Sequence, residues 1–285
     1  MRPPSVLQAF DCGGCERIGR YRASALLLAA RGVGLSDLDF DQYSEQSVHF
    51  YSRHVPRLLR MSLAGLSRAG AAIVDIGCGD GHLVWSLRSN QLIPPGCDVL
   101  GIDLSPIRLR RFQALTGCAT ALASGQGADS VANGSIDLVL STMVIEHVPD
   151  DAGHAVELGR ITRAGGVLYL STVIRKRGAW YFRKAPDGRR VLDPTHLREY
   201  ATPEEVLHMV EAAGFDVESV ELSRLFFPVA HPLIRWWHSH WPIRDVQRFF
   251  LGPMRWLELL ALPIPRYRAI EVLARRRDTN PRLTS

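Results

Sequence analysis

The fold of this chain is decided by one stretch of its sequence, Val74-Asp75-Ile76-Gly77-Cys78-Gly79-Asp80-Gly81. An apolar, β-branched run leads into it from residue 71, and an amphipathic segment follows over residues 83–90. This pattern predicts a strand, a tight turn and a helix. Glycines at three alternate positions let the main chain turn sharply and leave room for a ligand to lie against it. The turn is therefore the first predicted binding site.

Short apolar runs alternate with longer amphipathic runs on both sides of this turn, from about residue 55 to residue 172. Such alternation is typical of βαβ units around a parallel sheet. Ser105 followed by Pro106 marks a helix start, as a cap and a first helical residue. Further strands are predicted at 98–103, 118–123, 136–141, 166–173, 215–222 and 267–274, and further helices at 105–115, 152–163 and 202–214. The sequence thus predicts an α/β fold with a doubly wound, mainly parallel, seven-stranded sheet.

The acidic residues of the turn distinguish between two nucleotide ligands. Dinucleotide sites use G-x-G-x-x-G, so that a diphosphate rests on the helix N-terminus. This turn instead reads G-x-G-x-G and carries Asp75 and Asp80, which would repel a diphosphate and suit a ligand with positive charge. Asp103 ends the next predicted strand, where an acidic residue accepts hydrogen bonds from ribose hydroxyls. The pattern favours a cationic nucleoside over NAD.

Four stretches together resemble the class I S-adenosylmethionine-dependent methyltransferases of the small-molecule type. Residues 74–81 resemble that family's glycine-rich first motif, and residues 100–105 resemble its ribose-binding second motif. Residues 136–148 and 160–168 resemble the segments around its fourth and fifth strands. The resemblance implies a Rossmann-like fold, S-adenosylmethionine as cofactor and methyl transfer as the activity, but it does not indicate the acceptor.

The resemblance also implies which residues contact the cofactor. Asp75 and the glycines would contact its methionine part, Asp103 its ribose, and residues 126–128 its adenine. The full set is Asp75, Gly77, Cys78, Gly79, Gly81, Asp103, Leu104, Gln126, Gly127 and Ala128. The chain departs from the family at residues 125–129, which lack the usual acidic residue followed by a small one. It departs also at Ala164, which replaces a proline.

Methyl transfer to an oxygen or nitrogen requires a base, and two histidines are candidates. His147 lies just past the fourth strand, at the carboxyl edge where open α/β sheets bind ligands. The alternative to a catalytic role for His147 is that Glu146 and His147 close the cofactor pocket or cap a turn. His196 lies in the polar loop after the fifth strand, where the acceptor is expected; its alternative is a surface position. The predicted reaction is methylation of a small or amphipathic acceptor on oxygen, and no metal is predicted.

Basic and aromatic residues follow the fifth strand and recur near the C-terminus. Residues 175–184 combine Arg and Lys with Trp180, Tyr181 and Phe182, which suits either an anionic acceptor or a solvated loop. Residues 223–266 are rich in Trp and Arg, and we read them as helices broken by Pro232, Pro242 and Pro253. This segment suits a lid or pocket wall, a dimer contact, or peripheral contact with an anionic membrane.

The chain divides into four predicted parts. Residues 1–54 form a helical N-terminal cap, and residues 55–222 form the Rossmann-like core. Residues 223–266 form an insertion, and residues 267–285 form the last strand and a tail. Cys12 and Cys15 have the spacing of half a zinc site or a redox pair, or are incidental thiols.

Composition sets broader limits. The chain has 285 residues, a net charge of +5, 46% hydrophobic residues and five cysteines, which suits a reduced, cytoplasmic globular protein. No apolar run is long enough to cross a bilayer, and no run of five basic residues indicates a nucleic-acid partner. Two alternatives to a methyltransferase remain at this point: an NAD(P)-dependent oxidoreductase, and a non-catalytic protein that binds the cofactor or docks on a membrane.

Overall fold

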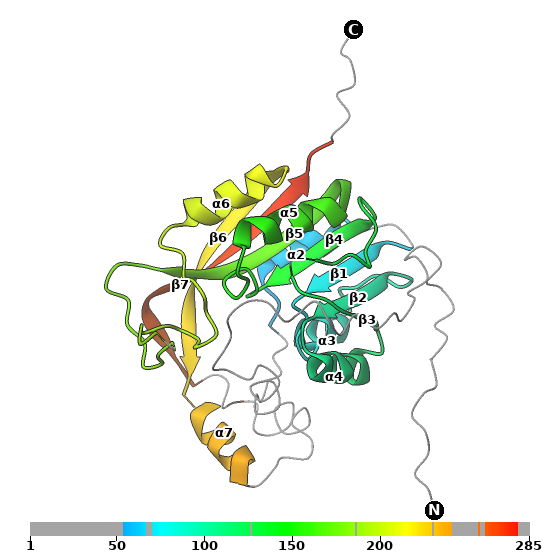
Figure 1. The fold of residues 1–285 in the computed structure, drawn as a ribbon. Helices are drawn as coiled ribbons and strands as arrows, with labels where there is room; N and C mark the ends of the chain where they lie inside the picture. Colours follow the sequence, from blue (N-terminus) through cyan, green and yellow to red (C-terminus); the bar gives the residue numbers. More distant parts are fainter. Residues whose placement is uncertain are drawn as a thin grey trace, which may run out of the picture.

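The computed structural model describes residues 54–66, 70–125, 127–185, 187–229, 231–240, 256 and 260–278. Its helices, shown in Figure 1, are α2 (Arg57–Ala64), α3 (His82–Ser89), α4 (Pro106–Thr116), α5 (Asp151–Ile161), α6 (Pro203–Ala212) and α7 (His231–His240). Its strands are β1 (Ala72–Ile76), β2 (Asp98–Asp103), β3 (Ala119–Leu122), β4 (Ile136–Thr142), β5 (Thr162–Arg175), β6 (Phe215–Pro228) and β7 (Ala261–Arg276). The N-terminal segment, including Cys12 and Cys15, and the tail from residue 279 lie outside the described residues.

One seven-stranded sheet joins these strands in the order β3-β2-β1-β4-β5-β7-β6. Strands β1 to β5 are parallel, and β7 runs antiparallel to both β5 and β6. The predicted doubly wound, mainly parallel sheet is confirmed. The chain leaves β1 for β2 on one side and returns to β4 on the other. Ligands bind beyond the carboxyl ends of the strands at such a switch point.

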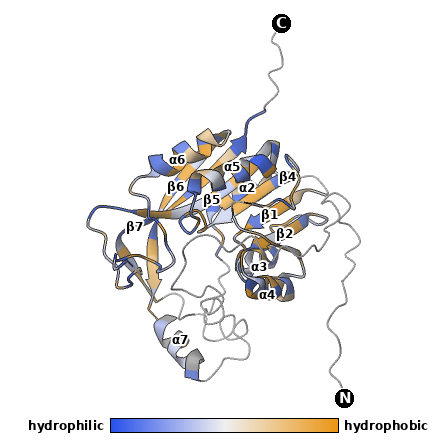
Figure 2. Ribbon diagram, in the orientation of Figure 1, coloured by the Kyte–Doolittle hydropathy of each residue, from blue (hydrophilic) through white to orange (hydrophobic). Residues whose placement is uncertain are grey.

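Helices cover both faces of the sheet, because alternate strand side chains point to opposite faces. Val74 and Ile76 of β1 belong to the core that packs against α5 and α6. Ile73, between them in sequence, belongs to the core that packs against α2, α3 and α4. All five residues of β1 are buried, and Figure 2 shows the central strands as predominantly hydrophobic.

Helix boundaries follow their local signals. Ser105 caps α4 by accepting a hydrogen bond from the Arg108 N–H (3.4 Å), and Gly117, with φ +66°, ends that helix. Asp150 caps α5 in the same way through the Gly153 N–H (2.8 Å). Helix α5 ends at Ile161, before the predicted residue 163, because Thr162 already pairs with Ile136 as the start of β5.

The prediction of proline-broken helices over residues 223–266 is wrong at both ends of that segment. Strand β6 continues to Pro228, and β7 begins at Ala261, so the two form an antiparallel ribbon in which Phe227 lies opposite Leu262. Pro232 lies in the first turn of α7, where proline is tolerated, so it does not break that helix. Pro242 and Pro253 lie outside the described residues.

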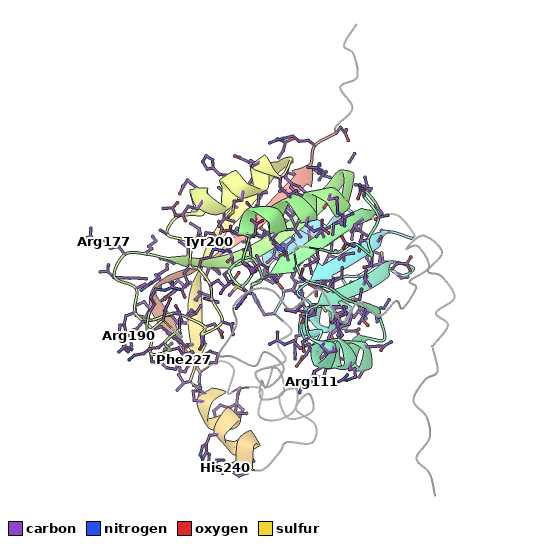
Figure 3. All side chains as sticks on the ribbon, in the orientation of Figure 1. Arg111, Arg177, Arg190, Tyr200, Phe227 and His240 are labelled. Atoms are coloured by element: carbon purple, nitrogen blue, oxygen red, sulfur yellow. The ribbon has the colours of Figure 1, made fainter. Side chains whose placement is uncertain are left out.

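The ribbon and the loop after β5 form a small second core, here called the side lobe (residues 176–185, 187–192, 223–229 and 260–268). Its centre is Ala179, Tyr181, Ile264 and Tyr267, with Phe227 packed against them. Figure 1 shows it beside the carboxyl end of the parallel strands, with α7 beyond it, and Figure 3 labels Arg190 and Phe227 within it. Within the described part of the chain, no helix has the length and apolar character needed to cross a membrane.

Candidate functional site

The glycine turn lies at the carboxyl edge of the sheet, between β1 and α3. Gly77, Gly79 and Gly81 have φ values of +69°, +54° and +90°, a region that side chains rarely adopt. The Gly77 N–H donates to the Ile102 carbonyl (2.8 Å), which ties the turn to β2. A Cβ on Gly77 would lie 2.3 Å from a methyl group of Val144. The turn therefore requires glycine for its conformation and, at Gly77, for its packing.

Asp103 joins the two loops of this edge. Its Oδ2 accepts from the Gly79 N–H and its Oδ1 from the Ser105 N–H, both at 2.9 Å. Burial raises the pKa of the Asp103 carboxyl, and these two backbone hydrogen bonds act against that increase. Leu104, the next residue, is exposed. Asp103, which is predicted to bind the ribose, thus also holds the loop after β1 and the loop after β2 together.

Asp75 is the least satisfied polar group of this edge. It is 1% exposed, and neither carboxylate oxygen has a hydrogen-bond partner among the described residues. Burial, and secondarily the nearby Asp103, raises its pKa to about 8. A buried carboxyl without a donor is costly, and an incoming positive group would relieve that cost. This fits the sulfonium and ammonium groups of S-adenosylmethionine.

Asp80 and Cys78 both have their side chains engaged within the protein. Asp80 forms an ion pair with Arg111 of α4 (3.3 Å), so its charge is balanced within the protein. The electrostatic preference for a cation therefore depends on Asp75 and Asp103. Cys78 directs its side chain into the core with α3 and α4, and burial raises the pKa of its thiol. A ligand would meet the backbone of Cys78, as expected for a small residue in such a turn.

The described residues of the segment 125–129, part of which is predicted to contact the adenine, are held mainly by α5. Gln126 lies outside the described residues, and the Gly127 N–H donates to the Ser124 carbonyl (3.2 Å). Ala128 is fully buried; its N–H donates to Glu157 Oε1 (2.7 Å), and its carbonyl accepts from Arg160 (3.0 Å). The polar backbone atoms of Ala128 are thus already bonded within the protein.

Sequence reasoning missed the residues of α5 that support this loop. His154 is fully buried; its Nδ1 bonds to the Gly125 carbonyl (2.7 Å) and its Nε2 to Ser141 Oγ (3.0 Å). Burial lowers the pKa of His154, which keeps the ring neutral. His154, Glu157 and Arg160 recur at every third residue, a spacing that lies along one helix face and could have identified them.

The two predicted bases meet although they lie far apart in sequence. The rings of His147 and His196 make an edge contact, with centroids 4.7 Å apart and planes at 69°. The loop that carries His196 is joined to the end of β4 by a hydrogen bond from the Leu197 N–H to the Glu146 carbonyl (3.0 Å). Val144, which packs against Gly77, belongs to the same short segment as His147. The segment that carries His147 therefore packs against the glycine turn through Val144.

Hydrogen bonds fix the proton on one of these rings. His147 Nδ1 lies 3.1 Å from the Thr195 carbonyl oxygen, which only accepts, so Nδ1 carries the hydrogen. The Thr195 hydroxyl in turn donates to Asp193 (2.6 Å). Burial, and secondarily the neighbouring His196, lowers the pKa of His147 to about 4. His147 is therefore neutral near pH 7, with its lone pair on Nε2.

Glu146 completes the cluster. It is fully buried; its Oε2 accepts from the Thr172 hydroxyl (2.8 Å), and its Oε1 has no partner among the described residues. Burial raises the pKa of this carboxyl. One ligand atom from each of Glu146, His147 and His196 lies within 4.8 Å of the others, a grouping that could hold a metal ion. The sequence prediction of no metal remains a prediction.

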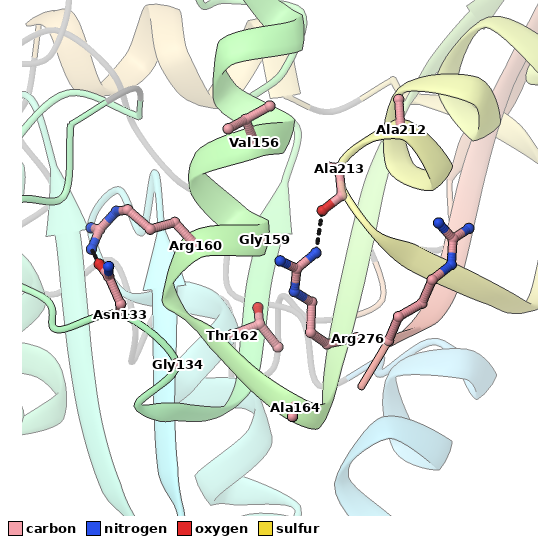
Figure 4. Close-up of a pocket in the computed structure, with 11 residues that line it drawn as sticks. Asn133, Gly134, Val156, Gly159, Arg160, Thr162, Ala164, Ala212, Ala213 and Arg276 are labelled. Carbon is pink, nitrogen blue, oxygen red and sulfur yellow. Dashed lines mark hydrogen bonds between the residues drawn. The ribbon is translucent and has the colours of Figure 1, made fainter. Parts of the chain in front are cut away.

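A surface hollow of about 530 Å³ lies at the opposite, amino edge of the sheet (Figure 4). It is bounded by the ends of α5 and α6 and by the start of β5. Its arginines bond to backbone carbonyls: Arg276 donates to Ala213 at the end of α6, and Arg160 to Ala128 and Val131. These bonds stabilise helix and loop ends, and the hollow lies at the edge of the sheet opposite the glycine turn.

Comparison with known proteins was consistent with this geometry. The family described as "methyltransferase domain" matches residues 45–220. The chain belongs to this methyltransferase family.

A ubiquinone biosynthesis O-methyltransferase from Xanthomonas axonopodis pv. citri is 30% identical to this methyltransferase over 179 residues, which cover 58% of this chain and 71% of the relative. One from Methylococcus capsulatus is 32% identical over 186 residues, covering 59% and 73%. A crystal structure of a putative methyltransferase from Bacillus halodurans superposes with a TM-score of 0.55 at 16% identity, covering 78% of this chain and 99% of that one, which supports the fold.

Family membership resolves the alternatives left by the sequence. The protein is an S-adenosylmethionine-dependent methyltransferase with a Rossmann-like fold. The NAD(P)-dependent oxidoreductase and the non-catalytic protein are therefore set aside. The individual contacts of the cofactor and the base remain predictions.

Proposed function

We propose that this methyltransferase methylates a hydroxyl oxygen of an amphipathic, ring-containing acceptor, with His196 as the base. The observation that carries the proposal is the pairing of His147 and His196 beside the glycine turn. The acceptor class follows the relatives, which are named ubiquinone biosynthesis O-methyltransferases. Their identity of about 30% supports the reaction type more strongly than the exact acceptor.

On the donor side, S-adenosylmethionine supplies a methyl group on a positively charged sulfur, which leaves as a neutral thioether. The Asp75 carboxylate would pair with the positive charge of the donor. Asp103 would hold the ribose of the donor through the carboxylate lone pairs that remain after the two backbone hydrogen bonds. The bare main chain of the turn would let the donor approach closely. The protein's main task is to align donor and acceptor along one line.

On the acceptor side, the two histidines would have different roles. A pKa of about 4 makes His147 a weak base, suited to accept a hydrogen bond from the acceptor and orient it. His196 would remove the hydroxyl proton as the O–CH3 bond forms. Glu146, buried between β4 and the loop after β5, would help to exclude water from this position.

The test of this function is methyl transfer from labelled S-adenosylmethionine to lipid and metabolite extracts, with products identified by mass spectrometry. We expect a product heavier by one methyl group on oxygen. His196→Ala should reduce turnover at least about tenfold and leave S-adenosylhomocysteine affinity within a factor of two. The matched control is His208→Ala, at an exposed histidine of α6. Methylation on nitrogen or carbon, or an unchanged rate for His196→Ala, would contradict the proposal.

We infer further that the side lobe meets an anionic membrane surface from which an apolar acceptor is taken. Its described residues include nine lysines and arginines and one acidic residue, Asp187. Phe182, Phe226 and Leu262 are each at least half exposed on it. Basic residues combined with exposed aromatics suit the headgroup region of a bilayer.

Vesicle sedimentation tests this contact. The protein should bind vesicles that contain an anionic phospholipid more strongly than vesicles of neutral lipid alone, and salt should weaken the binding. Leu262→Ser should reduce it, whereas Val156→Ser, at an exposed valine of α5, should not. Equal binding to both vesicle types, or equal loss in both variants, would exclude a specific role for the side lobe.

A further inference from the structure

The carboxyl of Glu199 is buried and surrounded by hydrogen-bond donors from several elements. Its side chain is 2% exposed. Its Oε1 accepts from the Leu192 N–H (2.6 Å) and lies 3.1 Å from His196 Nδ1. Its Oε2 accepts from the Tyr267 hydroxyl (2.9 Å) and lies 3.6 Å from Arg175 Nε. A loop, β5 and β7 thus converge on one carboxyl group.

The surroundings of Glu199 favour its ionised form, because the Leu192 N–H and the Tyr267 hydroxyl donate to it and the Arg175 guanidinium lies 3.6 Å away. Burial raises the pKa of Glu199, but its contacts with His196, with the Leu192 N–H and with the Tyr267 hydroxyl outweigh burial and leave the pKa below its ordinary value. The Leu192 and Tyr267 donors do not depend on the tautomer of His196. An ionised carboxylate only accepts hydrogen bonds, so the partner nitrogen of His196 must carry the hydrogen. A neutral imidazole with its hydrogen on Nδ1 has its lone pair on Nε2.

We infer that Glu199 is a positioning residue, which fixes the proton of His196 on Nδ1 and leaves Nε2 to take the proton of the acceptor hydroxyl. This inference rests on the proposed function. In the reaction, the oxygen–hydrogen bond of the acceptor breaks toward Nε2 while the oxygen–methyl bond forms and the sulfur–methyl bond breaks. The imidazolium that results carries a hydrogen on each nitrogen, and Glu199 stabilises its positive charge.

Other charged groups around His196 bear on the same step. Glu146, from the segment after β4, lies within the 4.8 Å cluster. Asp193, in the same loop as His196, is engaged by Thr195 and by Arg183 (3.1 Å). Arg175 lies beside Glu199. A divalent cation held by Glu146, His147 and His196 would use the same Nε2 lone pairs, so the test must distinguish a proton acceptor from a metal ligand.

Nitrogen NMR of the full chain labelled with 15N-histidine tests the inference without any acceptor. The His196 signals are assigned by their absence in His196→Gln. In the wild type, neutral His196 should show hydrogen on Nδ1 and a lone pair on Nε2. In Glu199→Gln, whose amide both donates and accepts, this single tautomer should become a mixture. The matched control is Glu271→Gln, at another buried carboxyl that accepts from a tyrosine hydroxyl, Tyr169 (3.1 Å); it should leave the His196 signals unchanged.

Kinetics supplies the second measurement. Glu199→Gln should lower kcat at least about tenfold while the KM for S-adenosylmethionine stays within a factor of two. Hydrogen on Nε2 in the wild type would overturn the inference, even if the variant does not fold. So would shifts of both histidines on adding Mg²⁺ or Zn²⁺ together with loss of activity in EDTA. If the tautomer is as expected but no oxygen is methylated, the proposed function fails while the role of Glu199 in holding the Nδ1 proton stands.

Discussion

We expect Asp75 to link the stability of the fold to cofactor binding. Its pKa is about 8 in the folded chain, against 3.8 for an ordinary Asp. Because the folded pKa is the higher, the stability this group contributes is fully present below about pH 4 and is lost as the pH rises toward 8. Ionisation of a buried carboxyl with no donor is the physical cause.

Asp75→Asn should therefore stabilise the cofactor-free protein, and the gain should grow with pH. Thermal unfolding of both proteins between pH 5 and pH 8.5 measures this, since the neutral amide has no charge to bury. The variant should also bind S-adenosylmethionine at least about tenfold more weakly, because the loss of a charged partner costs about 1.5–3 kcal/mol. Melting temperatures that differ by a constant amount at every pH would contradict the assignment.

The raised pKa of Asp75 predicts that the protein releases a proton when it binds S-adenosylmethionine. Below pH 8 Asp75 is mostly protonated without cofactor, and a cationic ligand favours its ionised form. Calorimetry at pH 7 in phosphate and in Tris, which differ in ionisation enthalpy, should show different apparent heats for S-adenosylmethionine. In Asp75→Asn the two heats should become closer. Identical heats in both buffers for the wild type would argue against a titration of Asp75.

At the scale of the elements, the turn between β1 and α3 depends on glycine for two separable reasons. Gly77→Ala adds the strain of a positive φ, roughly 1–2 kcal/mol, to a contact of 2.3 Å with Val144. Gly70→Ala has the strain alone, because a Cβ at Gly70, with φ +78°, meets nothing within 4 Å.

Gly77→Ala should thus destabilise the fold more than Gly70→Ala and should abolish cofactor binding, whereas Gly70→Ala should leave binding unchanged. Denaturant unfolding and calorimetry measure the two effects. Adding Val144→Ala to Gly77→Ala should recover part of the lost stability, because it removes the methyl groups in the way. Equal destabilisation by the two single glycine variants would mean that packing at Val144 has no effect.

Strand β6 shows where an element-scale prediction ends. Residues 215–222 alternate between buried or half-buried positions and exposed positions, and the sequence shows the same period of two. Beyond Arg224 the register shifts, and two adjacent aromatics, Phe226 and Phe227, break the alternation. Phe227 packs in the side lobe while Phe226 is exposed. The continuation of the strand depends on pairing with β7, which no local pattern reveals.

For the whole molecule, cofactor binding should appear as thermal stabilisation. A ligand at a hundredfold excess over its Kd adds about 2.7 kcal/mol to the free energy of unfolding. S-adenosylhomocysteine should therefore raise the melting temperature by several degrees. NADH at the same concentration should not, because the turn reads G-x-G-x-G and lacks the G-x-G-x-x-G on which a dinucleotide's diphosphate rests. Stabilisation by NADH alone would contradict the cofactor assignment.

The sequence by itself determined the strand–turn–helix around residues 71–90, the α/β class, the family and most helix starts. Each of these rests on local signals: the hydrophobic period, the helix caps, and glycines at positions where the chain must turn with a positive φ. Only the tertiary structure revealed that Asp80 is paired with Arg111, that α5 holds the loop around Gly125 and Ala128, and that Glu199 bonds to His196. Such contacts join residues from separate elements, and they depend on the path of loops and the register between strands. His147 and His196 meet because β4 and β5 are neighbours, a proximity that spacing along the chain does not encode.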